Sequence, residues 1–387
     1  MHVGIVGFFR GDVLKFERVA IEAIGFTLPP EVVTSANIET SLGPVYERLK
    51  LPEGRLALMS GIEERRFWKP GTAIGAPSVE SARNALEATN LEPNDIGCLI
   101  HASVCRDYLE PATACRVHAE LGLGNDCWVY DLSNACLGIL SGMVQIATMI
   151  ELGAIRAGIV VGTESGRNLV ESTIAALNTD ESLTRKSIKP SFASLTIGSG
   201  SCGILLCDRE LSQTGNRLEA CVARAECEHH KLCQSDTDQA GASMQPLMQT
   251  DSEQLLHAGV GVGVRNFEQL LAEGYERADW DRTVCHQVGS THRNLMLESL
   301  DMPPTQDVST FRWLGNTGSV ALPTALAMGL LSEQIQPGQK AALLGIGSGI
   351  NSVMMATHWE RPSVVGKLDE NAKKNLNLES ATPSTVN

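Results

Sequence analysis

Cys136 is the residue whose neighbours best suit it to act as a nucleophile. It stands in the stretch DLSNACLGIL, between a turn of small residues and the beginning of a long apolar helix. The N-terminus of a helix offers free backbone N–H groups and a partial positive charge, and both favour the nucleophilic thiolate. The small neighbours would let a thioester carbonyl approach. A buried structural thiol is the alternative, because free cysteines are usually packed in cores.

Two further residues could assist a nucleophile at Cys136. His286 ends an apolar segment in VCHQVGSTHRN, and an imidazole there can transfer a proton or donate a hydrogen bond to an enolate oxygen. Asn316 stands in LGNTGSVALP, where its side-chain amide can help to hold an oxyanion. A core histidine and a helix cap are the structural alternatives. We expect His292 to lie at the surface or behind the site.

The elements that would position these residues occur twice along the chain. Each half contains a helix, a polar turn and a buried strand, followed by a turn, an apolar helix and a second strand. The second strands end alike, in IVVGTESG and ALLGIGSG. This order predicts an α/β fold of two duplicated halves, whose equivalent loops meet at one central point.

At that point we expect the side chains of Cys136, His286 and Asn316 to meet. The GIGSG turn would also bring the backbone N–H of Ser348 close to the thiol, where it could hold an oxyanion together with the N–H of Cys136. The same pattern divides the chain into an N-terminal extension (1–17), a first half (18–210), a second half (211–359) and a polar tail (360–387), which we predict to be disordered.

Composition excludes several classes of protein. The 387 residues are 43% hydrophobic and carry a formal charge of −14, so a large core can form and non-specific nucleic-acid binding is disfavoured. No apolar run reaches the roughly 18 residues that a membrane span needs. The N-terminal segment lacks the basic region and cleavage site of a signal peptide. We therefore expect a cytoplasmic protein.

The eleven cysteines are an odd number in a large chain, which favours reduced thiols over a disulfide framework. One segment, CVARAECEHHKLC, combines three cysteines with His229 and His230. Its spacing does not match the Cys and His pairs of zinc sites, so we predict no metal. A strand followed by a loop with buried thiols is the simpler interpretation.

The motifs at Cys136, His286–Gln287 and Asn316 together resemble those of thiolase-superfamily condensing enzymes of the β-ketoacyl-ACP synthase III type. The resemblance covers roughly residues 18–359. It implies a thiolase fold, a five-layer αβαβα sandwich that is normally a homodimer. It also implies that thioesters of coenzyme A or acyl carrier protein are the substrates and that no cofactor is used.

Four stretches, SVCRDYLEPATA, NACL, HQV and LLGIGSGIN, are similar to those of the OleA family, the head-to-head acyl-condensing enzymes of bacterial olefin biosynthesis. This resemblance implies that Cys136 takes a fatty acyl group from acyl-CoA. It also implies that Glu110 crosses the dimer interface as the base that deprotonates a second acyl-CoA. The product would be a 2-alkyl-3-keto acid. A solvated loop carboxylate is the alternative for Glu110.

A decarboxylating 3-oxoacyl-ACP synthase III, which extends an acyl chain with malonyl-ACP, is the second interpretation. Such an enzyme generates its carbanion by losing CO₂ and needs no base such as Glu110. A third is a non-catalytic partner subunit, which the intact Cys136 disfavours. The chain also lacks a tryptophan in EGRLALMSG, where synthase III enzymes bind the adenine of coenzyme A. We assign Arg65 and Arg66 to substrate phosphates, with structural ion pairs as the alternative.

Overall fold

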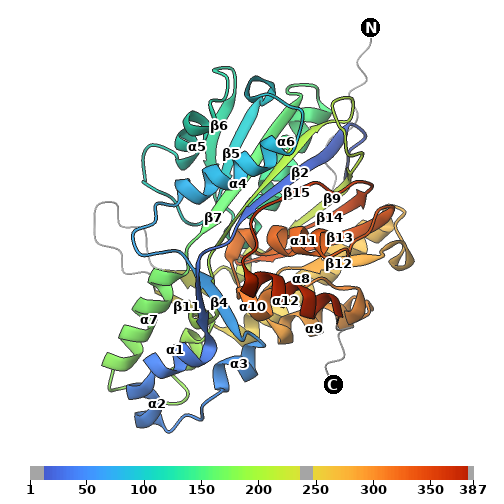
Figure 1. Ribbon diagram of the computed structural model, residues 1–387. Coiled ribbons are helices and arrows are strands. Elements are labelled where there is room, and N and C mark those ends of the chain that lie inside the picture. Colours follow the sequence, from blue (N-terminus) through green and yellow to red (C-terminus); the bar gives the residue numbers. More distant parts are fainter. Residues whose placement is uncertain (1–12, 236–246, 382–387) are drawn as a thin grey trace.

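The computed structural model describes residues 13–235 and 247–381 and shows a mixed α/β fold with a large central sheet (Figure 1). The predicted N-terminal extension is described only from Val13 onward. Its short strand β1 (Leu14–Lys15) pairs antiparallel with β9 (Arg217–Ala225), so this part of the extension belongs to the sheet.

The first half contributes five strands in the order β2-β8-β7-β5-β6. Strands β5, β6 and β7 are parallel, whereas β8 is antiparallel to both β7 and β2. Apolar runs such as AGIVVGTE and GSCGILLCD are buried along their whole length, as expected for strands covered on both faces. The strands are β2 (Val19–Thr27), β5 (Cys98–Ala102), β6 (Trp128–Leu132), β7 (Ala157–Glu164) and β8 (Gly200–Asp208).

The second half repeats this order as β9-β14-β13-β12. An isolated parallel bridge between Thr283 and Asp307 occupies the place that β6 has in the first half, so the predicted duplication is confirmed in the topology. A bridge between Ala20 and Arg217 joins β2 to β9, and the sheet is therefore continuous. The remaining strands of this half are β12 (Arg282–Cys285), β13 (Gln339–Gly347) and β14 (Asn351–Trp359).

The side chain of Asn216 strengthens the connection between the halves. Its Nδ2 donates to the carbonyl oxygens of Ile21 and Arg361, each at 3.2 Å. Its Oδ1 accepts from the backbone N–H groups of Glu360 and Arg361 at 2.8 and 3.0 Å. The predicted boundary between residues 210 and 211 falls in the same connection, between β8 and β9.

Helices cover the sheet in layers, which confirms the predicted αβαβα sandwich (Figure 1). Helices α4 and α5 pack on the outer face of the first half, and α8 and α9 pack on that of the second. The apolar helices α6 and α11 share one buried cluster between the halves. These layer helices are α4 (Gly75–Glu87), α5 (Thr113–Leu121), α6 (Gly138–Glu151), α8 (Ser252–Ala272), α9 (Ser290–Ser299) and α11 (Ala321–Leu331).

A smaller lobe with its own apolar cluster lies beside the sandwich. Figure 1 shows it at the lower left, where α7 packs beside three short helices. The elements are α1 (Ser35–Ser41), α2 (Gly43–Leu49), α3 (Arg55–Ser60), α7 (Arg167–Thr179), and the antiparallel pair β3 (Glu31–Thr34) and β4 (Glu64–Phe67). The fold also contains a short antiparallel pair, β10 (Cys233–Ser235) and β11 (Met248–Thr250), and the short helix α10 (Phe311–Leu314).

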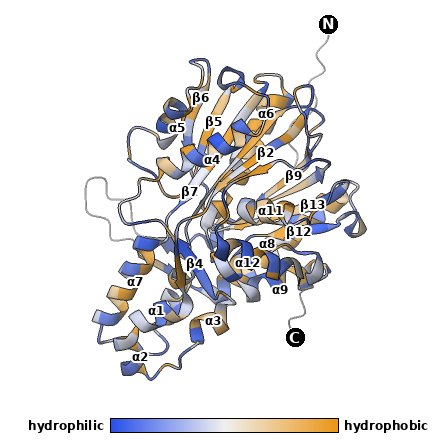
Figure 2. Ribbon diagram, in the orientation of Figure 1, coloured by the Kyte–Doolittle hydropathy of each residue, from blue (hydrophilic) through white to orange (hydrophobic). Residues whose placement is uncertain are grey.

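The prediction of a disordered tail at 360–387 is wrong for its described part. Residues Val364–Val365 (β15) pair with β2, and Glu370–Ala381 form helix α12. Figure 2 shows that α12 is mainly hydrophilic, in contrast to the strands of the sheet. The helix is nevertheless anchored, because Ala372 and Leu376 are buried in the central cluster. These two positions are too few to reveal a helix by composition.

Within the described residues, no helix is long and apolar enough to cross a membrane.

Candidate active site

Cys136 lies in a short 3₁₀ turn, Ala135–Leu137, that leads directly into α6. The preceding residue, Ala135, has a φ of 44°, a left-handed conformation that is unfavourable for a residue with a Cβ. This bend turns the chain sharply between β6 and α6. The side chain of Cys136 remains partly accessible. The predicted helix start at the cysteine is therefore present, although α6 itself begins two residues later.

The helix start favours the thiolate of Cys136, as expected, but burial opposes this effect more strongly. Burial raises the pKa of its thiol to about 12, and the charges of Glu164 and Cys233 act in the same direction. The backbone N–H of Cys136 lowers this pKa, but less strongly. Desolvation therefore outweighs the backbone dipoles, and the thiol is protonated at neutral pH.

His286 follows β12 and is buried, with 4% of its surface exposed. Its backbone N–H donates to the carbonyl of Leu344 in β13 at 3.1 Å, which fixes it beside that strand. Its Nδ1 is buried without a hydrogen-bond partner among the described residues. Burial and, to a lesser extent, the nearby His292 lower the pKa of His286 to about 3. The imidazole is therefore neutral at physiological pH and can donate from only one nitrogen.

Asn316 follows α10 and a left-handed glycine, Gly315, with φ 68°. Its backbone is held by Thr196 and Gly198, through hydrogen bonds of 3.1 and 2.8 Å. Its side-chain Oδ1 accepts the N–H of Gly318 at 3.0 Å. Because the oxygen of the amide is occupied in this way, the NH₂ group is the end that can donate to an oxyanion.

The elements that carry these three residues meet at the junction of the two halves. The turn of Cys136 contacts both β13 and the 3₁₀ turn Gly318–Val320, which follows Asn316. His286 is bonded to the same β13. Ser348 lies in the turn after β13, and the residue before it, Gly347, lies beside the turn of Cys136. A Cβ added at Gly347 would lie 3.7 Å from the backbone nitrogen of Cys136.

Glu110 lies in the loop between β5 and α5 and is exposed. Other side chains of this loop are also exposed although they are apolar, with exposed fractions of 53% for Val104, 66% for Tyr108 and 56% for Leu109. Strand β6 is at the edge of the sheet, and its Trp128 is 65% exposed. An apolar surface of this kind next to a free sheet edge is typical of a protein interface.

The assignment of Arg65 and Arg66 to substrate phosphates is wrong. Both side chains are buried, with exposed fractions of 0% and 1%. The Arg65 guanidinium donates to Ser35 Oγ and to the Leu195 carbonyl, and burial lowers its pKa to about 10. Arg66 forms a bidentate ion pair with the carboxylate of Asp369, with N–O distances of 2.7 and 2.8 Å. These contacts hold the terminal guanidinium nitrogens of both residues inside the protein, away from any substrate at the surface.

His292 is buried in α9, with 8% exposure, which excludes the surface position considered for it.

Gln287 joins two parts of the site. Its amide nitrogen donates to the Cys285 carbonyl, and its oxygen accepts from the N–H groups of Thr310 and Phe311 at the start of α10. The amide therefore ties the end of β12, next to His286, to the helix that leads to Asn316.

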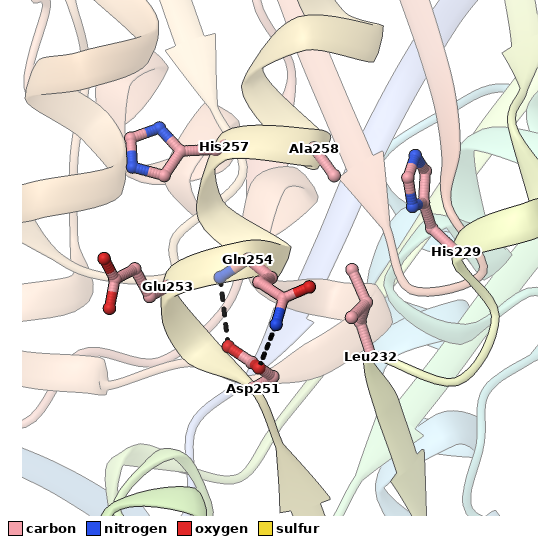
Figure 3. A pocket seen from close by; sticks show the side chains of 7 residues that line it. All are labelled: His229, Leu232, Asp251, Glu253, Gln254, His257 and Ala258. Carbon is pink, nitrogen blue, oxygen red and sulfur yellow. Dashed lines mark hydrogen bonds between the residues drawn. The ribbon is translucent and has the colours of Figure 1, made fainter.

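A separate groove lies at the N-terminus of α8 and contains none of the predicted site residues (Figure 3). Its lining is His229, Leu232, Asp251, Glu253, Gln254, His257 and Ala258. Possible metal-binding atoms of Glu226, Glu228 and His229 lie within 4.8 Å of one another. The carboxylate of Glu226, however, is already paired with Arg224 and Arg265. Cys227 is exposed, which corrects the expectation of buried thiols throughout this segment.

One residue of the site was not predicted from sequence. Glu164, at the end of β7, is a buried carboxylate whose charge acts on Cys136. Its sequence signal was a glutamate directly after the apolar strand AGIVVGT. An acidic residue in such a position is unusual unless it has partners.

Comparison with known proteins gives matches over most of the chain. The family model of the C-terminal part of 3-oxoacyl-[acyl-carrier-protein] synthase III matches residues 270–359. An acyl-CoA:acyl-CoA alkyltransferase of Shewanella oneidensis is 38% identical over 355 residues, which cover 89% of this chain and 100% of that protein. A protein of the same name from Xanthomonas campestris is 32% identical over 349 residues, with coverages of 89% and 100%.

Solved structures are similar over the same extent. Xanthomonas campestris OleA, in a cysteine-to-serine variant with bound lauric acid and lauroyl-CoA, has a TM-score of 0.83 and 31% identity. The match covers 89% of this chain and 100% of that structure. Further structures of the same protein carry substitutions of a glutamate or a histidine.

Proposed function

This chain belongs to the OleA family of acyl-CoA:acyl-CoA alkyltransferases, and we propose that it joins two fatty acyl-CoA molecules head to head in a non-decarboxylative Claisen condensation. The observation that carries the proposal is the arrangement of Glu110 and Cys136. In Xanthomonas campestris OleA, the replaced glutamate and the replaced cysteine are the same number of residues apart as Glu110 and Cys136 are here.

In the first half-reaction, the sulfur of Cys136 attacks the thioester carbonyl of one acyl-CoA. The C–S bond to coenzyme A breaks, an acyl-cysteine forms, and the proton of the Cys136 thiol ends on the released coenzyme A thiol. The tetrahedral oxyanion accepts hydrogen bonds from the backbone N–H groups of Cys136 and Ser348. Preformed donors of this kind commonly contribute about 10²–10³-fold in rate.

In the second half-reaction, Glu110 removes a proton from the α-carbon of another acyl-CoA. Neutral His286 and the NH₂ group of Asn316 donate hydrogen bonds to the enolate oxygen. The α-carbon then attacks the acyl-cysteine, so that a C–C bond forms, the C–S bond breaks, and the leaving Cys136 thiolate recovers the proton that Glu110 removed. Hydrolysis of the remaining thioester yields a 2-alkyl-3-keto acid and coenzyme A. An α-proton next to a thioester is only weakly acidic, so that a base and enolate donors are both required.

We further propose that the protein acts as a cytoplasmic homodimer without a cofactor. The apolar surface of the Glu110 loop and the free edge of β6 support an interface at this place. A loop that is exposed in one protomer can deliver Glu110 to the partner's Cys136. All bonds made and broken in the reaction belong to the two substrates, Cys136, Glu110 and water, so the chemistry requires no cofactor.

The experiment is a product analysis by mass spectrometry. Purified protein receives myristoyl-CoA alone or together with malonyl-ACP, and Glu110→Ala is compared with Glu181→Ala, an exposed glutamate outside the site. We expect a β-keto acid with two fatty chains from myristoyl-CoA alone, reduced by at least about 100-fold in Glu110→Ala and unchanged in the control.

Product that forms only with malonyl-ACP, and that does not depend on Glu110, would overturn the proposal in favour of a chain-extending 3-oxoacyl-ACP synthase III. The family relationship favours the head-to-head reaction over this alternative. A protein that releases no coenzyme A from myristoyl-CoA at all would instead be a non-catalytic subunit.

A further inference from the structure

Glu164 is a buried acidic residue for which the reaction as described has no use. It ends β7, where all eight residues are buried, and is 6% exposed. Among residues 13–235 and 247–381, no lysine, arginine or histidine forms an ion pair with it. A carboxylate removed from water without a cation is costly unless hydrogen bonds replace its hydration. The hydrogen-bond donors around Glu164 therefore stabilise its buried carboxylate.

These donors come from two different parts of the site. Oε1 accepts the N–H of Val104 at 3.0 Å, and Oε2 faces the N–H of Cys105 at 3.4 Å. Both residues begin the loop that carries Glu110. Oε1 also accepts the hydroxyl of Ser319 at 2.6 Å, and Ser319 lies in the 3₁₀ turn that follows Asn316. One carboxylate thus holds the base loop and the amide turn together.

Gly318 extends this connection to Asn316 itself. Its φ is 57°, and a Cβ added there would lie 3.2 Å from Cγ of Glu164. The N–H of the same glycine donates to Oδ1 of Asn316. The residue that orients the Asn316 amide therefore lies directly against Glu164. A change in the position of the carboxylate would be transmitted to the amide through one residue.

We propose that Glu164 is a positioning residue for the condensation step, which fixes the start of the Glu110 loop and the Asn316 turn relative to each other beside Cys136. The inference rests on the proposed function and concerns the second half-reaction. Acylation uses the thiol and two backbone N–H groups. Enolate formation requires the base and the amide at the same time, and an error of about 1 Å in such a geometry can reduce a rate by about 100-fold.

The test compares two variants of Glu164. Glu164→Gln keeps the length of the side chain but removes its charge, and Glu164→Asp keeps the charge but shortens its reach. Three rates are measured on the full-length protein with myristoyl-CoA: the burst of released coenzyme A, the exchange of the α-proton in D₂O, and the formation of condensed product. Glu181→Gln serves as the control for an acidic residue outside the site.

We expect Glu164→Asp to keep the acylation burst within about threefold and Glu164→Gln to acylate at least as fast as the wild type, whereas exchange and condensation fall by roughly tenfold or more in both variants. Removing the charge also lowers the pKa of the Cys136 thiol, because Glu164 is one of the groups that raise it. In Glu164→Gln, alkylation of the Cys136 peptide by iodoacetamide should therefore reach half its maximal rate at a lower pH.

Equal losses of acylation and condensation, or condensation at the wild-type rate per acylated site, would overturn the inference. If Glu164→Gln does not fold, as judged by its thermal transition, Ser319→Ala decides the question, because it removes the 2.6 Å donor and leaves the charge in place. A wild-type protein that forms no product from myristoyl-CoA would refute the proposed function instead. The two failures are therefore distinguishable.

Discussion

The thiol of Cys136 and the imidazole of His286 are both held in their neutral forms by burial. A neutral imidazole can donate a hydrogen bond to an enolate without first competing for the proton of the thiol. This suits a reaction in which oxyanions appear and disappear while the net charge of the site changes little. The thiol and the imidazole therefore do not form a thiolate–imidazolium ion pair in the free protein.

Types and spacing were sufficient to predict Cys136, His286 and Asn316 as one constellation on the matching elements of a duplicated fold. Their protonation could not be predicted in the same way. It depends on the desolvation of the junction and on Glu164, which lies on another strand. Sequence identifies the chemical groups, whereas the pKa values arise from packing that only the structure contains.

A buried neutral histidine should also make stability depend on pH. Burial lowers the pKa of His292 from 6.5 to about 4, so that between these values the unfolded chain binds more protons than the folded one. The contribution of His292 to the free energy of unfolding is therefore fully present above pH 6.5. It is lost as the pH decreases toward 4, by at most about 1.4 kcal/mol per pH unit.

His292→Asn should reduce the loss of unfolding free energy between pH 7.5 and 5 by roughly 2 kcal/mol, measured by urea denaturation. His257→Asn, at an exposed position, is the matched control. The raised pKa of Glu379, about 8, has the opposite sign but is present in all three proteins. An identical pH dependence in His292→Asn and wild type would contradict the prediction.

At the scale of elements, the most informative contact joins β4 to the C-terminal helix. Arg66 bonds both carboxylate oxygens of Asp369, just before α12, and the side chain of Asn371 within it. The pair spans 303 positions of the chain. Sequence analysis could not relate such distant residues, which explains two errors together: the arginines were assigned to substrate, and the tail was expected to be disordered.

We predict that Asp369→Ala lowers the free energy of unfolding by about 1–3 kcal/mol, because it leaves the buried Arg66 guanidinium without its carboxylate. The lower part of this range reflects the 50% exposure of the Asp369 side chain. Urea denaturation measures the loss, and proteolysis after residue 369 should become faster. The KM for myristoyl-CoA should not change.

Glu370→Ala is a suitable control, since its side chain is 90% exposed and pairs only locally with Lys373. A KM that rises severalfold in Asp369→Ala, while stability is preserved, would instead restore Arg66 as a phosphate-binding residue.

At the scale of the whole molecule, the proposed dimer makes a prediction about mixed protomers. Cys136→Ala and Glu110→Ala are each expected to be inactive. When they are unfolded and refolded together, a mixed dimer has one complete site if the partner supplies Glu110. Random pairing should then restore about a quarter of the wild-type condensation rate, measured as product from myristoyl-CoA.

No recovery in the mixture, although mixed dimers are detected by native mass spectrometry, would show that Glu110 serves the cysteine of its own chain. Adding Trp128→Glu to both variants provides the control, because a charge on the exposed edge strand should prevent pairing and remove the recovery.

The two halves that enclose the site are joined by the bridge from β2 to β9 and by the four hydrogen bonds of Asn216. Separating the halves would break this continuous hydrogen-bond network. We therefore expect the two halves to move as one rigid body. Any movement that admits a substrate should then come from the loops and side chains around Cys136 rather than from rotation of one half against the other.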